Sequence, residues 1–323
     1  MKNNIISVTA NTIVCVCVFS LSLCASETTV DPFYNDTTGI SGIKVEHIGG
    51  NIPNDADYKW WHGCSPTSAG MLMGYYDRNG YEGQAYDNLV PGGVAEASTF
   101  GTENYMVNNI IASQGHIDDF YKGGYANSGD DVSAPFHEFN CLADFMGTSQ
   151  DAYGNSNGST SFYNWTDSND PLTSVDIEYY GLQDNSGMYG IGEYIRYAGY
   201  DYDTLYSQHI EGYNGNAGGF TLDDYINSID DERPVIIQIE GHSMLGVGYD
   251  DQDNSTIYVH DTWSEGDHAM PWGGTYSGLQ QTGVTVVGLV PEPNALIFLF
   301  VFAILIYIRR SILRLISPLY SSV

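Results

Sequence analysis

The sequence predicts an α+β fold, in which a helix that opens at Ser65 or Pro66 precedes a mostly antiparallel sheet. Proline is favoured in the first helical turn, because its missing N–H would have no intrahelical partner there. Short apolar runs bounded by turn residues predict strands in the last third of the chain, at 235–239, 242–249, 256–261 and 284–290. Helices followed by such strands are typical of an α+β plan.

Capping residues and the spacing of apolar residues predict where the first helix ends and where further helices lie. The first helix should end near Asn79-Gly80, since both residues are common stop signals. Thr221 with an acid three positions later resembles a capping box and predicts a helix over 221–229. Apolar spacing predicts further helices, at 103–113, 135–146 and 188–198. Segment 148–187 is rich in Gly, Ser, Asn and Asp and predicts an irregular or β-hairpin insertion.

Both ends of the chain have the composition of export signals. Residues 1–26 combine Lys2, an apolar run and small residues, which predicts a secretory signal peptide. Residues 27–50 form a polar arm, and 51–289 are expected to form the main domain. The tail 290–323 contains Pro-Glu-Pro, a hydrophobic helix and an arginine cluster, an order that resembles the PEP-CTERM sorting signal. That resemblance implies transient membrane insertion, an exosortase-type partner and delivery to the cell surface or outside the cell; an ordinary membrane anchor is the alternative.

The charge of the chain excludes one class of partner. The formal net charge is −30, from 40 acidic and 10 basic residues. Such a surface repels phosphate backbones, so we expect no nucleic-acid binding. It favours cationic partners or divalent ions, or serves only to keep an exported protein soluble.

Two cysteines remain once the signal peptide is removed. Cys64 and Cys141 could form a disulfide in an oxidising compartment, but Cys141 falls on an apolar helical face and is expected to be a core thiol. No cofactor or metal site is predicted. His116 beside Asp118 and Asp119 is expected to form a surface turn, and the acidic stretch 250–254 a solvated one.

Three separated residues have the types and order of a thiol catalytic site. Cys64 stands at a helix N-terminus, where the helix dipole favours the thiolate. His242 begins one predicted strand and Asp261 ends the next, which supplies a base and a residue to orient it. His62 is a rival base, although a residue two positions before a nucleophile rarely faces back onto it.

The stretches around these residues, Gly63-Cys-Ser-Pro-Thr-Ser-Ala-Gly and Gly241-His-Ser-Met-Leu-Gly-Val-Gly-Tyr-Asp, resemble the papain-fold cysteine peptidases related to the bacteriocin-processing, double-glycine-leader peptidases. The resemblance implies a papain-like fold, with Cys64 as nucleophile, His242 as general base and acid, and Asp261 as the orienting residue. Such enzymes usually carry an oxyanion-binding glutamine about six residues before the cysteine. Here that position is Tyr58, so the expected oxyanion donors are the Tyr58 hydroxyl and the Cys64 N–H.

The sequence therefore predicts an exported cysteine peptidase or amide hydrolase that cleaves a peptide or protein through an acyl-enzyme. Two alternatives stay open. One is a catalytically inactive papain-fold binding or matrix protein, suggested by Tyr58 and the aromatic-rich insertion. The other is an acyltransferase, in which an amine replaces water.

Overall fold

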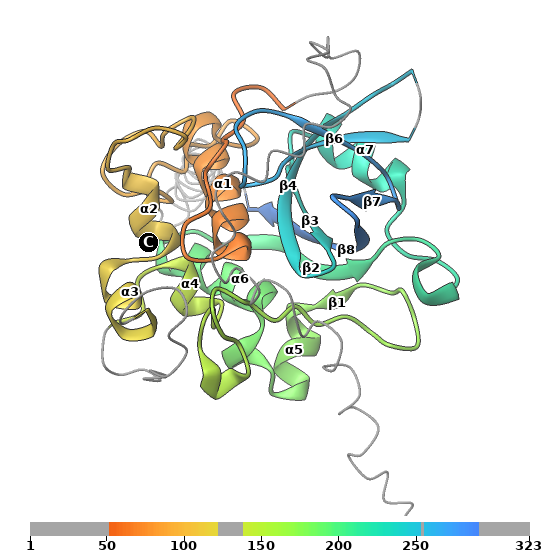
Figure 1. Cartoon of the computed structure of the whole chain (residues 1–323), viewed down its shortest axis with the longest axis horizontal. Coiled ribbons are helices and arrows are strands. Elements are labelled where there is room, and N and C mark those ends of the chain that lie inside the picture. Colours follow the sequence, from red (N-terminus) through yellow and green to blue (C-terminus); the bar gives the residue numbers. More distant parts are fainter. Residues whose placement is uncertain (1–51, 122–137, 253–254, 291–323) are drawn as a thin grey trace, which may run out of the picture.

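The computed structural model describes residues 52–121, 138–252 and 255–290, and α1 (Cys64–Asn79) lies at its centre (Figure 1). Nearly all of α1 is buried. Two of its glycines explain how neighbours come so close: a Cβ at Gly70 would overlap Ile111, and one at Gly74 would overlap the Tyr58 hydroxyl. The predicted helix is confirmed, with its start at Cys64 itself.

The other helices are α2 (Met106–Ile111), α3 (Gln114–Phe120), α4 (Leu142–Phe145), α5 (Ser174–Tyr180), α6 (Gly187–Tyr197) and α7 (Leu222–Asp230), with the 3-10 turns η2 (Asp151–Tyr153), η3 (Gln183–Asn185) and η4 (Tyr213–Gly215). In Figure 1, α2, α3 and α4 lie on the side of α1 away from the sheet, α5 and α6 lie below α1, and α7 lies against the sheet near β6. The capping box predicted at Thr221 is present and opens α7. The helix predicted over 135–146 lies partly outside the described residues, and only α4 is found within it.

The prediction of a surface turn at His116 was wrong, because this residue lies in α3 and is fully buried. Ser113 caps that helix, its side chain accepting a hydrogen bond from the His116 N–H. The insertion 148–187 is also more regular than predicted. Its second half contains α5, which begins with a capping box at Thr173, and the short strand that precedes it.

The sheet is antiparallel at every pairing described, in the order β1-β2-β8-β3-β4-β5-β6, with β7 paired to β8. Its strands are β1 (Leu172–Thr173), β2 (Tyr202–His209), β3 (Val235–Ile239), β4 (His242–Tyr249), β5 (Thr256–His260), β6 (His268–Pro271), β7 (Thr275–Tyr276) and β8 (Leu279–Leu289). Mixed helices and an antiparallel sheet agree with the predicted α+β class. The strands do not all follow the helices, however, since β1 and β2 precede α7.

The arrangement of α1 and β4 brings distant parts of the sequence together. β3 and β4 form a tight hairpin in which Ile239 pairs with His242, so His242 stands at the first position of β4. α1 packs on β4 on one side and on α2 and α4 on the other (Figure 1). This packing sets the N-terminus of α1 beside the start of β4.

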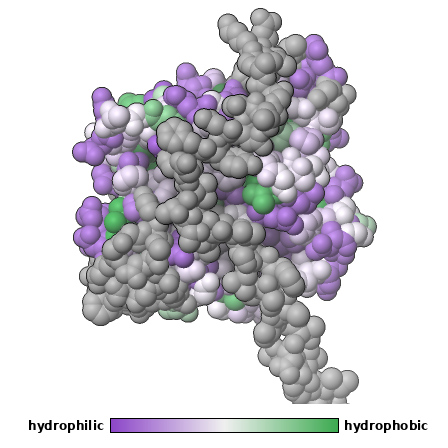
Figure 2. Space-filling model, viewed as in Figure 1, coloured by the Kyte–Doolittle hydropathy of each residue, from purple (hydrophilic) through white to green (hydrophobic). Residues whose placement is uncertain are grey.

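The surface agrees with the acidic composition. On the face drawn in Figure 2 the coloured atoms are mostly hydrophilic or intermediate in hydropathy, with small scattered hydrophobic spots. Within the described ranges, no helix has the length and apolar character needed to cross a membrane. The predicted signal peptide (1–26), polar arm (27–50) and all but the first residue of the sorting signal (290–323) lie outside these ranges.

Candidate active site

Cys64 is the first residue of α1, and hydrogen bonds between Thr67 of α1 and the preceding loop hold it in place. The Thr67 hydroxyl donates to the Gly63 carbonyl at 2.6 Å and accepts from the Trp61 N–H at 3.0 Å. A side chain at Gly63 would meet the Pro66 ring at 2.8 Å, so glycine is required before the cysteine. Cys64 is thereby fixed at the positive end of the helix dipole, where a thiolate is favoured.

His242 is buried at the start of β4, and its two ring nitrogens have different partners. Nε2 donates to the main-chain oxygen of Asp261 at 2.8 Å, which leaves Nδ1 for the sulfur of Cys64. Burial lowers the pKa of His242, but the charge and hydrogen bond of Cys64, together with Asp261, outweigh it and raise the pKa above its ordinary value. The geometry thus favours an imidazolium beside a thiolate.

A second contact ties the same two elements together. The hydroxyls of Ser65 and Ser243, both buried, lie 2.9 Å apart. Each serine directly follows one of the two reactive residues, so this hydrogen bond fixes the spacing between Cys64 and His242. Sequence analysis missed this pair; the only signal was its adjacency to the two reactive residues.

Asp261 meets His242 differently from the expectation. It follows the last residue of β5, and its main-chain oxygen, not its carboxylate, accepts the hydrogen bond from the ring. The carboxylate instead accepts from the N–H groups of Trp263 and Ser264, at 2.8 and 2.9 Å, and from the Tyr276 hydroxyl at 2.7 Å. Asp261 therefore shapes the turn that presents its own carbonyl, and its charge also acts on His242.

The turn built by Asp261 places an indole over the imidazole. Trp263 stacks on His242 with ring centroids 4.0 Å apart and an interplanar angle of 18°. Trp263 remains 39% exposed, so it shields one face of the ring while forming part of the surface beside it. An aromatic face also stabilises a protonated imidazole. This role was not predicted, although Trp263 stands only two positions after Asp261.

Tyr58 does not occupy the oxyanion position that was expected for it. Its hydroxyl donates to the Glu96 carbonyl at 2.7 Å and lies against Gly74. Ten residues of α-helix separate Gly74 from Cys64, a rise of about 15 Å. The physical reason is packing: Tyr58 is fully buried and fills the space that the missing side chain of Gly74 leaves. Of the two oxyanion donors expected from the sequence, this leaves the Cys64 N–H.

The rival base His62 lies among aromatic rings. It packs edge-on against Trp61 and Tyr121, with centroids 4.8 and 4.7 Å away. Burial, followed by the charge of His116, lowers the pKa of His62 to about 4. Cys64 acts on His242 and is not among the groups that shift His62. A base with such a low pKa is a weak proton acceptor at neutral pH.

With this geometry in place, comparison with known proteins adds one finding. A family model described as "Peptidase_C39 like family" matches residues 140–277. It supports a papain-like cysteine peptidase relative. The matched region contains His242 and Asp261 and begins after Cys64. No curated protein and no solved structure matches the chain.

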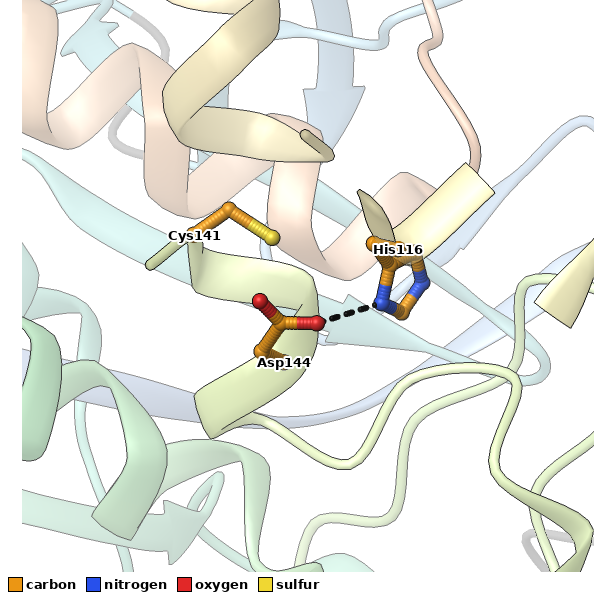
Figure 3. A group of neighbouring side chains, drawn as sticks. All are labelled: His116, Cys141 and Asp144. Carbon is orange, nitrogen blue, oxygen red and sulfur yellow. Dashed lines mark hydrogen bonds and ion pairs between the residues drawn. The ribbon is translucent and has the colours of Figure 1, made fainter. Parts of the chain in front are cut away.

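Away from Cys64 and His242, the structure brings together another set of chemically active residues, of which Cys141 and Asp144 lie within the matched region and His116 before it. His116 of α3 meets Asp144 of α4, Nδ1 to Oδ1 at 2.8 Å, and the Cys141 thiol lies close to the same two side chains (Figure 3). All three are buried, and the pKa of Cys141 is raised by burial first and then by Asp144. Neither Cys141 nor Cys64 is in a disulfide and Cys141 is fully buried, so the core-thiol prediction for Cys141 is confirmed.

Proposed function

We propose that the protein is a cysteine peptidase in which Cys64 is the nucleophile and His242 the general base and acid. The observation that carries this proposal is the placement of His242, which is held by the Asp261 carbonyl through Nε2 and interacts with Cys64. The family match supports the same class of reaction. The position of Cys64 at the start of α1 supports its role as the thiolate.

The proposed reaction proceeds through an acyl-enzyme. The Cys64 thiolate attacks the carbonyl carbon of a peptide bond, and the resulting oxyanion accepts a hydrogen bond from the Cys64 N–H. His242 then gives its proton to the leaving amine, which breaks the C–N bond and leaves a thioester. A water molecule attacks the thioester as His242 takes its proton, and the acid product leaves. Through its main-chain oxygen, Asp261 keeps Nε2 protonated and Nδ1 directed at the sulfur throughout.

Two surfaces beside Cys64 are proposed to receive the substrate. The exposed Trp263 lies on the His242 side. On the other side the insertion approaches the nucleophile loop, because the Gly158 oxygen lies 3.0 Å from the position of a Cβ at Gly63. A peptide bound over Cys64 would run between Trp263 and this part of the insertion.

We also propose that the enzyme acts outside the cytoplasm. Residues 1–26 and 290–323 carry the composition of a signal peptide and of a sorting signal that an exosortase-type enzyme would cleave. The acidic charge suits an exported protein. Cell fractionation tests this: full-length protein should reach the cell surface or medium, and deletion of 290–323 should prevent surface retention.

A non-catalytic binding protein is the second candidate, and one observation favours it. The side chain expected to help hold the oxyanion is Tyr58, and its hydroxyl donates to Glu96 instead. Removing one oxyanion donor costs an enzyme about 10²–10³ in kcat, so slow turnover would also follow from this arrangement. Incubation with a fluorogenic peptide library separates the two: turnover that Cys64→Ala abolishes supports the peptidase, and equal signal from both proteins refutes it.

A further inference from the structure

A second polar cluster lies where the segment before α1 meets the loop between β5 and β6. His260, the last residue of β5, directs Nε2 at Asp267 Oδ1 at 2.9 Å and at Asp55 Oδ2 at 3.6 Å. One ligand atom from each of the three residues lies within 4.8 Å of the others. The three side chains thus converge from segments about two hundred residues apart in the sequence.

The other nitrogen of His260 fixes which atom faces the cluster. Nδ1 donates to the main-chain oxygen of Ala56 at 2.8 Å. Metal-binding histidines almost always donate their second ring N–H to a carbonyl or carboxylate, and this bond selects the tautomer whose free nitrogen binds the ion. His260 has this arrangement, and its Nε2 is presented to two carboxylate oxygens.

A third carboxylate increases the negative charge. Asp57 is 7% exposed and accepts from the Gly266 N–H at 2.7 Å, while its Oδ1 lies 4.0 Å from His260 Nδ1. Among the described residues this Oδ1 has no hydrogen-bond partner. Burial raises the pKa of Asp57 to about 6, and the charge of His260 opposes that rise. Three carboxylates carry more negative charge than one protonated imidazole can balance. The cluster therefore favours a bound cation with a charge greater than one.

We propose that Asp55, His260 and Asp267 bind a divalent transition-metal ion of the zinc type. One imidazole nitrogen and two carboxylate oxygens suit such an ion, whereas Ca²⁺ prefers oxygen ligands alone. The Asp55 and Asp267 side chains are 23% and 24% exposed, which leaves access for water as a further ligand. The set around His116 and Cys141 is wholly buried, so it offers an ion no such access.

The proposed ion would brace the approach to Cys64. The segment from Asp55 to Trp60 is already joined to the turn after β5, through Gly266 to Asp57 and through the Trp60 N–H to the Thr262 oxygen at 2.7 Å. That turn carries the Asp261 carbonyl that holds His242. An ion shared by Asp55 and Asp267 would add a direct bond between the same two segments.

Zinc titration by calorimetry tests the proposal. The full chain carrying Cys64→Ala is used as the parent, because a catalytic thiolate would itself bind Zn²⁺. The parent should bind one Zn²⁺, and Asp55→Asn and Asp267→Asn should each weaken binding at least tenfold. The matched control Asp251→Asn, an exposed acid in the β4–β5 turn, should bind as the parent does. Cys141→Ala removes the soft ligand of the buried set and should also leave binding unchanged.

The pH dependence gives a readout that does not depend on any variant folding. His260 Nε2 must give up its proton to bind the ion, so a proton competes with the ion at this atom. Zinc affinity of the parent should therefore fall as the pH is lowered from 8 to 6, and binding should release protons. No binding by the parent, or binding that survives both aspartate substitutions, would overturn the proposal.

Discussion

The Ser65 and Ser243 hydroxyls share a buried hydrogen bond of 2.9 Å, one residue beyond Cys64 and His242. Truncating either serine leaves the other hydroxyl buried without this partner, which costs about 1–3 kcal/mol. We expect Ser65→Ala and Ser243→Ala each to lower the free energy of unfolding by that amount, and the double variant to lose little more. Urea unfolding of the four proteins measures this. Additive losses would show that the two hydroxyls do not interact in solution.

Removing the imidazole should change the ionisation of the thiol. In His242→Ala the thiolate loses its cationic partner, so the pKa of Cys64 should rise towards the ordinary value of about 8.5. At pH 6 such a thiol is less than about 1% ionised, and alkylation by iodoacetamide should slow by more than tenfold. The measurement is the alkylation rate from pH 4 to 10. His62→Ala serves as the control and should keep the parent profile; loss of thiolate in that variant instead would make His62 the base.

Replacing Asp261 by Asn should reduce activity less than replacing it by Ala. Asp261→Asn keeps the main-chain oxygen that binds His242 and an oxygen for the Trp263 and Ser264 N–H groups. It loses the negative charge that helps raise the pKa of His242. We expect Asp261→Asn to slow turnover modestly and to shift the basic limb of the pH–rate profile downwards, whereas Asp261→Ala should lose most activity. Equal losses in both variants would indicate that the carboxylate itself contacts the imidazole during the reaction.

Tyr58→Phe tests whether the Tyr58 hydroxyl has a structural role or helps to hold the oxyanion. The hydroxyl bonds to the Glu96 carbonyl, so its removal should lower the free energy of unfolding by about 1 kcal/mol and leave kcat unchanged. Peptide turnover and urea unfolding are measured on the same preparation. A fall in kcat of about 10² without loss of stability would restore Tyr58 as an oxyanion donor.

His260 should make the metal-free protein less stable as the pH rises. Its folded pKa of about 9 lies above the unfolded value of 6.5, so the stabilisation is complete below pH 6.5 and is lost as the pH passes through 9. The expected loss between pH 6.5 and 9.5 is about 3 kcal/mol. Urea unfolding in EDTA measures it. His260→Gln should flatten this slope, and an unchanged slope would assign it to another group.

The sequence predicted those helices and strands that are specified by local residue patterns. The capping box at Thr221 and the apolar run of β3 gave helix and strand with nearly correct bounds. β2 was missed because it carries polar and aromatic residues with only a partly buried pattern, and its pairing with β8 is a tertiary effect. The burial of His116 was missed for a similar reason, since its partner Asp144 lies in another helix.

For the candidate site, the sequence indicated which residues take part but not which of their atoms make the contacts. The types and order of Cys64, His242 and Asp261 were visible without coordinates. That Asp261 acts through its main-chain oxygen depends on the conformation of the turn after β5, which no residue pattern specifies. The position of Tyr58 depends on a helix packing so closely that Gly74 leaves room for a ring.

The separation of Cys64 and His242 along the chain has a consequence during synthesis. A nascent polypeptide that ends before β4 contains the thiol but no imidazole to ionise it, and the hydroxyl contact between Ser65 and Ser243 cannot form either. Long-range contacts of this kind are slow to form. If the proposed function holds, a reactive thiolate arises only after nearly the whole domain has been made and folded.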